Sequence, residues 1–258
     1  LGRRGSGKTE ALYDKMMTRL SEQRGKVHLV LPEQATFLHE KRIATLPGNR
    51  SLLDLEITSF RRMSRRHVPL NLLDPLGCHL LVYKLLKDQK EKFQSFRLSE
   101  VTGGVVKQML QAMSEASMNL LCGDDLRKKA EELEKTEQCG DLPRKLQDLA
   151  LLMDASVETL EGDTLNENEL LLCLEQRIRE KHLFCGDLFC FDDFFDFTAA
   201  EYRLLDALMS VGADLIFAFP HDAQDRRFRK TTLAMRKIRG MAQSHSIVCD
   251  VLPVYRED

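Results

Sequence analysis

The sequence predicts an α/β protein in which a parallel sheet is interrupted by an inserted helical segment. Three observations support this fold class. A glycine-rich, phosphate-binding pattern occupies residues 2–9 and is followed by a helical stretch. Short apolar runs typical of buried parallel strands recur near both ends of the chain, at 27–31, 188–194 and 214–219. Between them, residues 70–183 show no strand pattern, and leucines recur at helical spacing.

The opening pattern is a glycine, four residues and then Gly-Lys-Thr. Glycines leave the backbone bare enough for successive N–H groups to point at a phosphate. Lys8 would reach the β- and γ-phosphates as a point charge, and the Thr9 hydroxyl would hold Mg²⁺. The residues predicted to bind ATP here are Gly2, Gly5, Ser6, Gly7, Lys8 and Thr9. The alternative is a glycine-rich turn that binds nothing.

A helix is predicted over 10–21, with Leu12, Met16 and Leu20 on one face. A strand should precede the loop, and since only Leu1 stands before it, we expect the chain to begin within an element. Gly25 ends the helical stretch, and the buried strand at 27–31 completes a strand–helix–strand unit.

Residues 33–37 follow this strand at the edge where open parallel sheets bind ligands. Their polar side chains could contact a nucleic-acid backbone, although a plain helix start fits equally well. A further strand is predicted over 53–58, where Leu53, Leu55 and Ile57 alternate with other residues.

The next segment, residues 59–66, carries four arginines within six residues. Arginines beside hydroxyls and an aromatic ring suit phosphate contact and base stacking along single-stranded DNA. A basic helix face is the alternative. The predicted DNA-binding residues are Gln34, Thr36, Ser59, Phe60, Arg61, Arg62, Arg65 and Arg66.

The middle of the chain predicts an all-helical insert. Asp74 and Pro75 form a helix start, because proline suits the first turn. Further helices are expected over 99–118, 124–137 and 142–160, and a last one, with Thr164 and Glu167 as a capping box, running to Lys181. Three methionines are expected to pack in the core rather than to form a binding stripe: Met109, Met113 and Met118.

The apolar strand at 188–194 contains two aspartates. Asp192 is placed to hold Mg²⁺ at the strand tip. Asp193 is the one candidate catalytic residue, but it is shorter than the glutamate that usually orients the attacking water. Binding is therefore better supported than hydrolysis, and an acidic strand-to-loop turn is the alternative.

The remaining elements continue the α/β pattern. They are a helix over 199–209 capped by Thr198 and Glu201, a strand over 214–219, a basic helix over 226–241 and a last strand over 247–252. Asp222 and Gln224, after the strand, could sense a γ-phosphate.

Composition places the chain among ordinary soluble proteins, with 43% hydrophobic and 30% charged residues. Its 258 residues suit one or two domains, and we favour two. No apolar run approaches the roughly 20 residues of a membrane span, and no segment resembles a signal peptide. The seven cysteines form no C-x-x-C pair, which predicts reduced thiols in the cytoplasm, without zinc or disulfides, and a buried Cys190.

Charge is unevenly distributed along the chain. Lys and Arg outnumber Asp and Glu by 14 to 7 in residues 1–70 and by 8 to 3 in 226–258, whereas residues 71–225 carry 16 against 30. If the basic ends meet in space, they form one positive surface suited to phosphate or nucleic acid. Ordinary solvated faces are the alternative.

Several stretches together resemble the N-terminal region of the AddB family, which forms part of the bacterial AddAB helicase-nucleases. They are residues 1–10, 31–37, 59–63, 145–149 and 192–198. Two positions depart from the family pattern: Asp193 stands where glycine is usual, and Arg4 where a small residue is usual.

The resemblance implies a P-loop, superfamily-one helicase-like core at 1–70 and 185–258, with the helical subdomain inserted at 71–184. It also implies binding of ATP·Mg²⁺ and single-stranded DNA, a heterodimer with an AddA-type subunit and a role in double-strand break repair. Helicase activity of its own is not expected. The family's nuclease domain and iron–sulfur cluster are expected outside this chain. The alternatives are an active P-loop motor, a small nucleotide kinase, or an interaction scaffold that binds no nucleotide.

Overall fold

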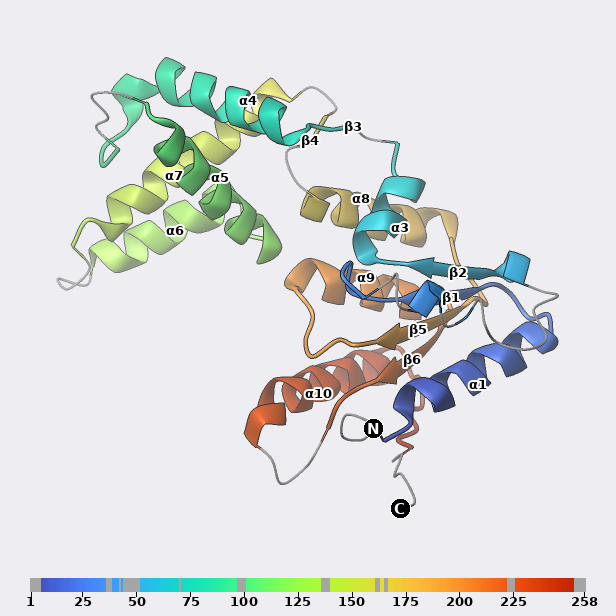
Figure 1. Ribbon diagram of the computed structural model, residues 1–258. Helices are drawn as coiled ribbons and strands as arrows, with labels where there is room; N and C mark the ends of the chain where they lie inside the picture. The colour runs from blue at the N-terminus through green and yellow to red at the C-terminus, as the bar shows by residue number, and fades with distance from the viewer. Residues whose placement is uncertain are drawn as a thin grey trace. The chain divides into compact units, whose positions relative to one another are not determined.

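The structure is a computed structural model with two compact units, each considered by itself (Figure 1). The first comprises Leu1–Val68 and Leu171–Asp258, and the second comprises Pro69–Leu170. The described residues are 6–35, 39–41, 43, 52–69, 71–96, 101–135, 140–160, 163–164, 167–221 and 226–252. Among them, no helix combines the length and the apolar character needed to cross a membrane.

A four-stranded parallel sheet forms the centre of the first unit and confirms the predicted α/β class. Its order is β2 (Leu55–Thr58), β1 (Val27–Val30), β5 (Leu188–Asp192) and β6 (Asp214–Ala218). The register sets Val30 opposite both Thr58 and Phe191, so the carboxyl ends of the strands share one edge. That edge is where parallel α/β sheets place their ligands.

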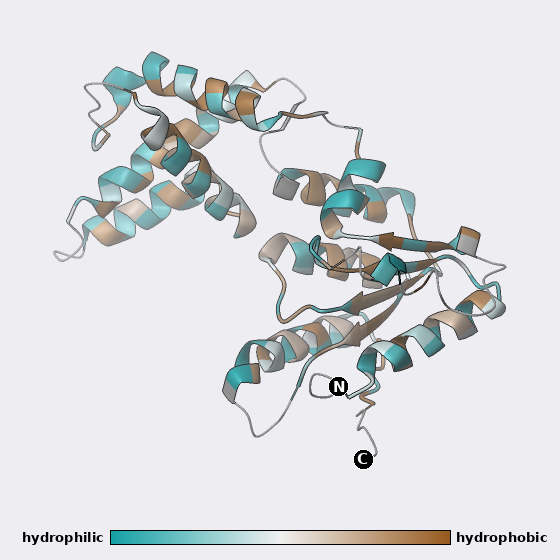
Figure 2. Ribbon diagram, viewed as in Figure 1, coloured by the Kyte–Doolittle hydropathy of each residue, from teal (hydrophilic) through white to brown (hydrophobic). Residues whose placement is uncertain are grey.

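Helices cover both faces of this sheet. Helix α1 (Lys8–Ser21) lies on one face, and α3 (Phe60–His67), α8 (Glu167–Lys181) and α9 (Ala199–Ser210) lie on the other (Figure 1). Every residue of β1 and β5 is therefore buried, which explains why both strands are mostly apolar apart from His28 and Asp192 (Figure 2). The predicted helix and capping box at Thr198 and Glu201 are confirmed.

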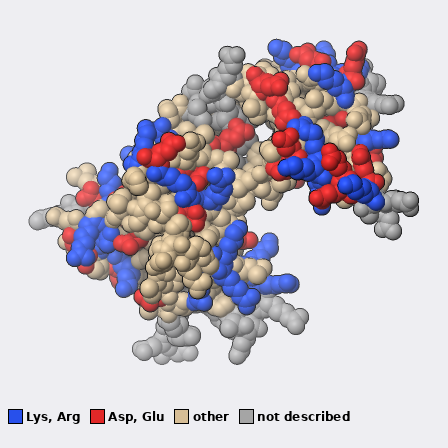
Figure 3. Space-filling view, turned by 180° about the vertical axis from the view of Figure 1, so that it is seen from behind, with Lys and Arg blue, Asp and Glu red and all other residues tan. Residues whose placement is uncertain are grey.

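Helix α10 (Arg229–Ser244) follows a short 3₁₀ turn, η3 (Arg226–Phe228), and packs against α9. The two basic segments of the first unit lie apart, because α3 follows edge strand β2 whereas α10 lies near the other edge strand, β6 (Figure 1). Lys and Arg side chains gather with few acidic neighbours near α10, in the lower part of Figure 3.

A cluster of aromatic rings fills the space between the sheet and the helices beyond it. Phe191 is at its centre, stacked on Phe217 with ring centroids 4.8 Å apart. Its ring also lies within 6.4 Å of four other phenylalanines, namely Phe60, Phe189, Phe194 and Phe197. Burial on this scale dominates the stability of the unit.

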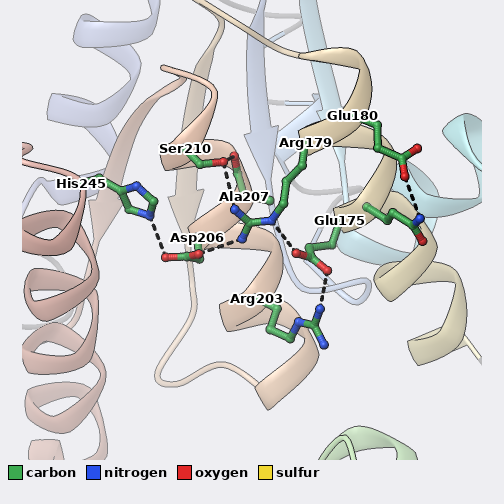
Figure 4. A network of polar contacts seen from close by, with 9 residues as sticks. Glu175, Arg179, Glu180, Arg203, Asp206, Ala207, Ser210 and His245 are labelled. Atoms are coloured by element: carbon green, nitrogen blue, oxygen red, sulfur yellow. Dashed lines mark hydrogen bonds and ion pairs between the residues drawn. The ribbon is translucent and has the colours of Figure 1, made fainter.

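A polar network ties α8, α9 and the end of α10 together (Figure 4). Arg179 donates to Glu175 at 2.6 Å and to Asp206 at 2.7 Å, and Arg203 donates to Glu175 at 2.7 Å. His245 contacts the second oxygen of Asp206 at 2.8 Å. Partial burial opposes ionisation of Asp206, but its bonds to Arg179 and His245 leave its pKa below the ordinary value.

Replacing Asp206 with asparagine should lower the free energy of unfolding by about 1 kcal/mol at pH 7, because partly exposed charge pairs are screened by water. A lowered carboxyl pKa stabilises the fold above the unfolded value, near 3.9, and this contribution disappears as the pH falls through the folded pKa. Urea unfolding at pH 7 and at several values from pH 4 down to about 2 measures both effects. A difference that stays the same as the pH falls from 4 to 2 would contradict the assignment.

The second unit is a helical bundle around its own apolar core. Its helices are α4 (Pro75–Asp88), α5 (Gly103–Met118), α6 (Gly123–Glu134) and α7 (Leu142–Thr159). Asp74 caps α4 through a hydrogen bond from the Gly77 backbone, as the Asp-Pro pair predicts. Most of α8, which we predicted within the insert, belongs to the first unit.

The prediction that this insert is all-helical was wrong. Two short parallel strands, β3 (Asn71–Leu72) and β4 (Asp163–Thr164), pair where the chain enters and leaves the bundle. Thr164 is thus a strand residue, and α8 begins only three residues later, at Glu167. Met109 and Met113 are buried as predicted, but Met118 is 41% exposed because it ends α5. The predicted start at Ser99 lies outside the described residues.

Asp148, within the stretch at 145–149, has a structural function. It is 2% exposed, and its carboxylate accepts hydrogen bonds from the backbone N–H groups of Gln94, Ser95 and Phe96, at 2.7–2.9 Å. These groups belong to the loop after α4, which would otherwise bury unpaired donors. The carboxylate therefore fixes this loop onto α7.

One predicted strand boundary and one predicted strand were also wrong. Leu53 lies in a 3₁₀ turn, η1 (Leu52–Asp54), and is 98% exposed. The ladder with β1 begins only at Leu55, so Leu53 lies outside it. Residues 247–252 form no ladder with any described strand, and Val248 is 86% exposed. In contrast, Cys190 is buried in β5 as predicted, and burial raises the pKa of its thiol.

Candidate functional site

The start of α1 lies at the carboxyl edge of the sheet. Gly7 precedes the helix in the left-handed region, with φ of 86° and ψ of 11°, a conformation that glycine adopts without steric cost. The N-cap residue of the helix is Gly7, which has no side chain to accept hydrogen bonds from the first turn. The N–H groups of that turn therefore stay available for a ligand. Aligned peptide dipoles give this helix end a partial positive charge, which favours an anion.

The side chains of Thr9 and Asp192 meet at this edge although 183 residues separate them. The Thr9 hydroxyl donates a hydrogen bond of 2.7 Å to Asp192 Oδ2. Asp192 ends β5 and is 2% exposed. These are the two residues predicted to share Mg²⁺, and the parallel order of the sheet brings them together.

The cluster holds opposite charges in partly desolvated positions. Burial lowers the pKa of Lys8, and the negative charges of Asp192 and Asp193 oppose this shift. Burial raises the pKa of Asp192, while hydrogen bonds from Thr9 and from the Asp193 backbone act the other way. A divalent cation beside Asp192 would favour its ionised form.

The described residues of the loop fit a phosphate ligand with its metal. The Ser6 hydroxyl is buried and has no hydrogen-bond partner among the residues the structure describes. Such a group is expected where a ligand supplies the partner. The uncapped helix start and the adjoining Thr9–Asp192 pair are consistent with the same ligand. Gly2 and Gly5, two further predicted contacts, lie outside the described residues.

Asp193 has an unusual backbone conformation. Its φ is 62°, in the left-handed region, and its N–H donates to Asp192 Oδ1 at 2.9 Å. The glycine usual here in the AddB family would adopt this conformation without strain. The Asp193 side chain is 60% exposed, and its Oδ2 lies 3.5 Å from His39 Nε2.

His39 was not predicted from the sequence. Its Nδ1 shares a hydrogen bond of 2.7 Å with the Tyr13 hydroxyl on α1, so that it links the helix to Asp193. It lies nine residues beyond the end of β1, past the polar residues considered in the sequence. Ligands are expected at the carboxyl edge of the sheet, and His39 could have been predicted if the segment considered after β1 had included it.

The left-handed conformation can be tested with two substitutions that both remove the Asp193 carboxylate. Asp193→Ala should be less stable than Asp193→Gly by about 1 kcal/mol, because Cβ is disfavoured at positive φ. The two variants lose the same side-chain contacts, so their difference in chemical unfolding isolates the backbone. At an ordinary backbone position glycine would be the less stable of the two, and that order would contradict the conformation.

The structure gives two of the predicted DNA-binding residues packing or capping functions. Ser59 caps α3, where its hydroxyl accepts from the Arg62 backbone at 3.2 Å and donates to Glu33 at 3.0 Å. Phe60 is 5% exposed within the aromatic cluster, so its ring is not available at the surface for stacking on a DNA base. Gln34 is exposed in the turn after β1. Thr36, Asp222 and Gln224 lie outside the described residues.

The exposed face of α3 carries arginines that are paired with carboxylates. The ion pairs are Arg61–Glu33 at 3.4 Å, Arg62–Glu40 at 3.2 Å and Arg66–Glu56 at 2.8 Å. Arg65 is exposed on the same helix. The acidic partners reduce the positive potential that a polyanion would meet at this helix.

The fold and site define an α/β protein whose parallel sheet holds a lysine, a threonine and an aspartate at its carboxyl edge. The family described as "ADDB, N-terminal" matches residues 1–257, and the chain belongs to this family.

Curated relatives agree with this assignment. The chain is 31% identical over 221 residues to the B subunit of the "ATP-dependent helicase/deoxyribonuclease" of Heliobacterium modesticaldum, and the match covers 81% of this chain and 18% of that protein. Proteins of the same name match from Bacillus subtilis, at 27% over 86% of this chain and 20% of theirs, and from Clostridium acetobutylicum, at 26% over 95% and 22%. The chain thus spans about a fifth of the length of these relatives.

Proposed function

We propose that this chain is the nucleotide-binding and DNA-binding N-terminal region of an AddB-type subunit, with little or no ATP turnover of its own. The observation that carries the nucleotide proposal is the 2.7 Å hydrogen bond between Thr9 and Asp192, beside the uncapped start of α1. This hydrogen bond brings together the hydroxyl and the carboxylate that would hold a nucleotide-bound Mg²⁺. ATP with Mg²⁺ is the ligand that this arrangement suits best.

Each residue has a separate task in this proposal. The N–H groups at the start of α1 and the Lys8 ammonium neutralise phosphate charge, while the Thr9 hydroxyl and the Asp192 carboxylate hold Mg²⁺. The cation supplies charge neutralisation at the phosphates when it is bound. The buried Ser6 hydroxyl gains a partner that the described part of the chain does not provide.

Low turnover is proposed because of Asp193. A hydrolysing P-loop enzyme needs a group that orients the attacking water. The Asp193 side chain is shorter than that of glutamate, and its carboxylate lies toward His39 at 3.5 Å, in an exposed position. Nucleotide is therefore proposed as a structural or regulatory ligand. An active motor and a small nucleotide kinase are the alternatives with turnover, and a scaffold is the alternative without binding.

Single-stranded DNA and an AddA-type subunit are the proposed macromolecular partners, in the repair of double-strand breaks. The relatives are named as one subunit of a helicase/deoxyribonuclease, which indicates an assembly with another subunit. The two basic helices of the first unit, α3 and α10, support the DNA proposal. The iron–sulfur cluster of the family is proposed to lie outside this chain, and none of its cysteines is assigned to it.

A titration of the purified chain with a fluorescent ATP analogue, with Mg²⁺ and with EDTA, tests the nucleotide proposal. A phosphate-release assay with and without a single-stranded oligonucleotide follows on the same sample. We expect saturable, Mg²⁺-dependent binding without phosphate release. DNA-stimulated release would establish a motor instead, and the absence of binding would favour the scaffold.

A further inference from the structure

Helix α10 and the turn before it form the most uniformly basic segment of the chain. No Asp or Glu occurs between residues 226 and 249. The seven cations of this segment are Arg226, Arg227, Arg229, Lys230, Arg236, Lys237 and Arg239. A helix with one sign of charge gains no i,i+4 ion pairs and is destabilised by self-repulsion. The stability of the helix therefore does not explain this concentration of positive charge, and we look for a ligand that does.

The cations of α10 point away from the core. The buried face of the helix consists of Thr231, Ala234, Ile238 and Ala242. Arg229 and Arg236 are exposed and seven residues apart, as are Lys230 and Lys237. Seven residues are about two turns, or roughly 10.5 Å, so these cations form two parallel rows along the exposed face. A repeated row of charge matches a polyanion better than a single small ion.

The α10 cations differ from the arginines of α3 in having no acidic partner among the residues that the structure describes. Within the described residues, no carboxylate pairs with Arg229, Lys230, Arg236 or Arg239. Lys237 is oriented by the Tyr202 ring, with its ammonium 3.6 Å from the ring centroid. Three arginines of α3 are each paired with a glutamate. A phosphate approaching α3 meets these carboxylates, whereas the described part of the chain pairs no carboxylate with those four cations of α10.

We infer that the exposed face of α10, rather than α3, makes the main contact with the phosphate backbone of nucleic acid. The inference rests on the DNA-binding part of the proposed function and locates it on residues outside the predicted set. Arginine suits phosphate oxygens because its planar guanidinium can donate two hydrogen bonds at once. The only large apolar side chain exposed on the described part of this helix is Leu233, so α10 has no broad apolar face for a membrane.

The face also has room for a backbone to approach. Gly240 lies on the exposed side, and a Cβ atom added there would meet nothing within 4 Å. The network around Asp206 and His245 holds the last turn of α10 on α9 and α8 (Figure 4). The cationic rows are therefore presented on a fixed helix, which limits the entropy lost on binding.

The test removes three charges from α10 in the full chain, with the substitutions Arg229→Gln, Lys230→Gln and Arg236→Gln. Glutamine keeps a high helix propensity, so we expect an unchanged thermal midpoint. The probe is a fluorescein-labelled oligothymidylate of about 20 nucleotides, titrated between roughly 50 and 200 mM KCl. Each phosphate contact on a single strand contributes about 0.7 to the slope of log affinity against log salt. The slope should become shallower by about 2, and affinity at the lowest salt should fall by about 10-fold or more.

The matched control removes the same number of charges from α3, through Arg61→Gln, Arg62→Gln and Arg66→Gln. A long-range effect of net charge would weaken binding equally in both variants. We expect this control to stay within about 3-fold of the unmodified chain with nearly the same salt slope. Duplex DNA of the same length, titrated in parallel, shows whether the cations of α10 bind single-stranded or double-stranded DNA more tightly.

An equal or greater loss in the α3 control would overturn the inference, and so would an α10 variant that binds like the unmodified chain. Binding of phosphatidylserine vesicles that depends on α10, without a change in oligonucleotide affinity, would also overturn it. If the unmodified chain binds no oligonucleotide, the DNA-binding part of the proposed function fails together with this inference. Titration with the fluorescent ATP analogue on the same samples tests the nucleotide part separately.

Discussion

Replacing Lys8 with alanine is expected to weaken binding of an ATP analogue by about 10- to 100-fold. Hydrogen bonds to charged groups contribute about 1.5–3 kcal/mol, and this ammonium would face two phosphates at a partly desolvated helix start. Asp192 and Asp193 lie close enough to influence the Lys8 pKa. Without the lysine, these carboxylates would repel the phosphates, which adds to the loss of affinity measured in the presence of Mg²⁺.

Lys15→Ala is the matched control, because Lys15 is an exposed lysine on the same helix. It removes the same charge and should change affinity by less than about 2-fold. Fluorescence titration gives both affinities, and thermal unfolding shows whether the Lys8→Ala chain is folded. Undiminished binding by a folded Lys8→Ala chain would show that the nucleotide contacts another part of the protein.

Phe191→Ala should cause the largest loss of stability, about 3–5 kcal/mol. Phe191 is 1% exposed, and its ring lies between Phe217 and Phe60, at centroid distances of 4.8 and 5.9 Å. Truncation leaves a cavity at the centre of the aromatic cluster, in a central strand with little freedom to relax. A loss of this size is a large part of the stability of an ordinary domain.

Phe195→Ala is the control, since Phe195 is 59% exposed four residues further along the chain. Its loss should stay below about 0.5 kcal/mol. Urea unfolding followed by far-ultraviolet circular dichroism compares the two variants. Similar losses would mean that the cluster around Phe191 contributes little to the core. The aromatic cluster also supports the site, because β5 carries Asp192 at its end.

The elements of the fold were predictable because they depend on local patterns. The apolar runs of β1 and β5 require burial on both faces, and the spacing of Leu12, Met16 and Leu20 requires a helix with one buried face. Errors arose where a local pattern had no partner in space. Leu53 alternates like a strand residue but lies beyond the ladder, and residues 247–252 have no described strand beside them.

The helical unit shows the reverse case, in which distant pairing overrides the local pattern. Thr164 reads as a helix cap, yet it pairs in β4 with Leu72 of β3, far earlier in the chain. The importance of Asp148 is equally invisible in sequence. Its residue type suggests a surface position, whereas three distant backbone N–H groups explain why it is buried.

The residue types at the candidate site, the class of fold and the resemblance to AddB could all be read from the linear chain, because they depend on spacing between residues. The folded arrangement was needed to show that Thr9 meets Asp192, that His39 reaches Asp193 and that Phe60 is buried. It also showed which basic helix is neutralised by carboxylates, since Glu33, Glu40 and Glu56 come from other segments. The physical reason is that such contacts depend on strand order and register, which arise only when distant segments pack together.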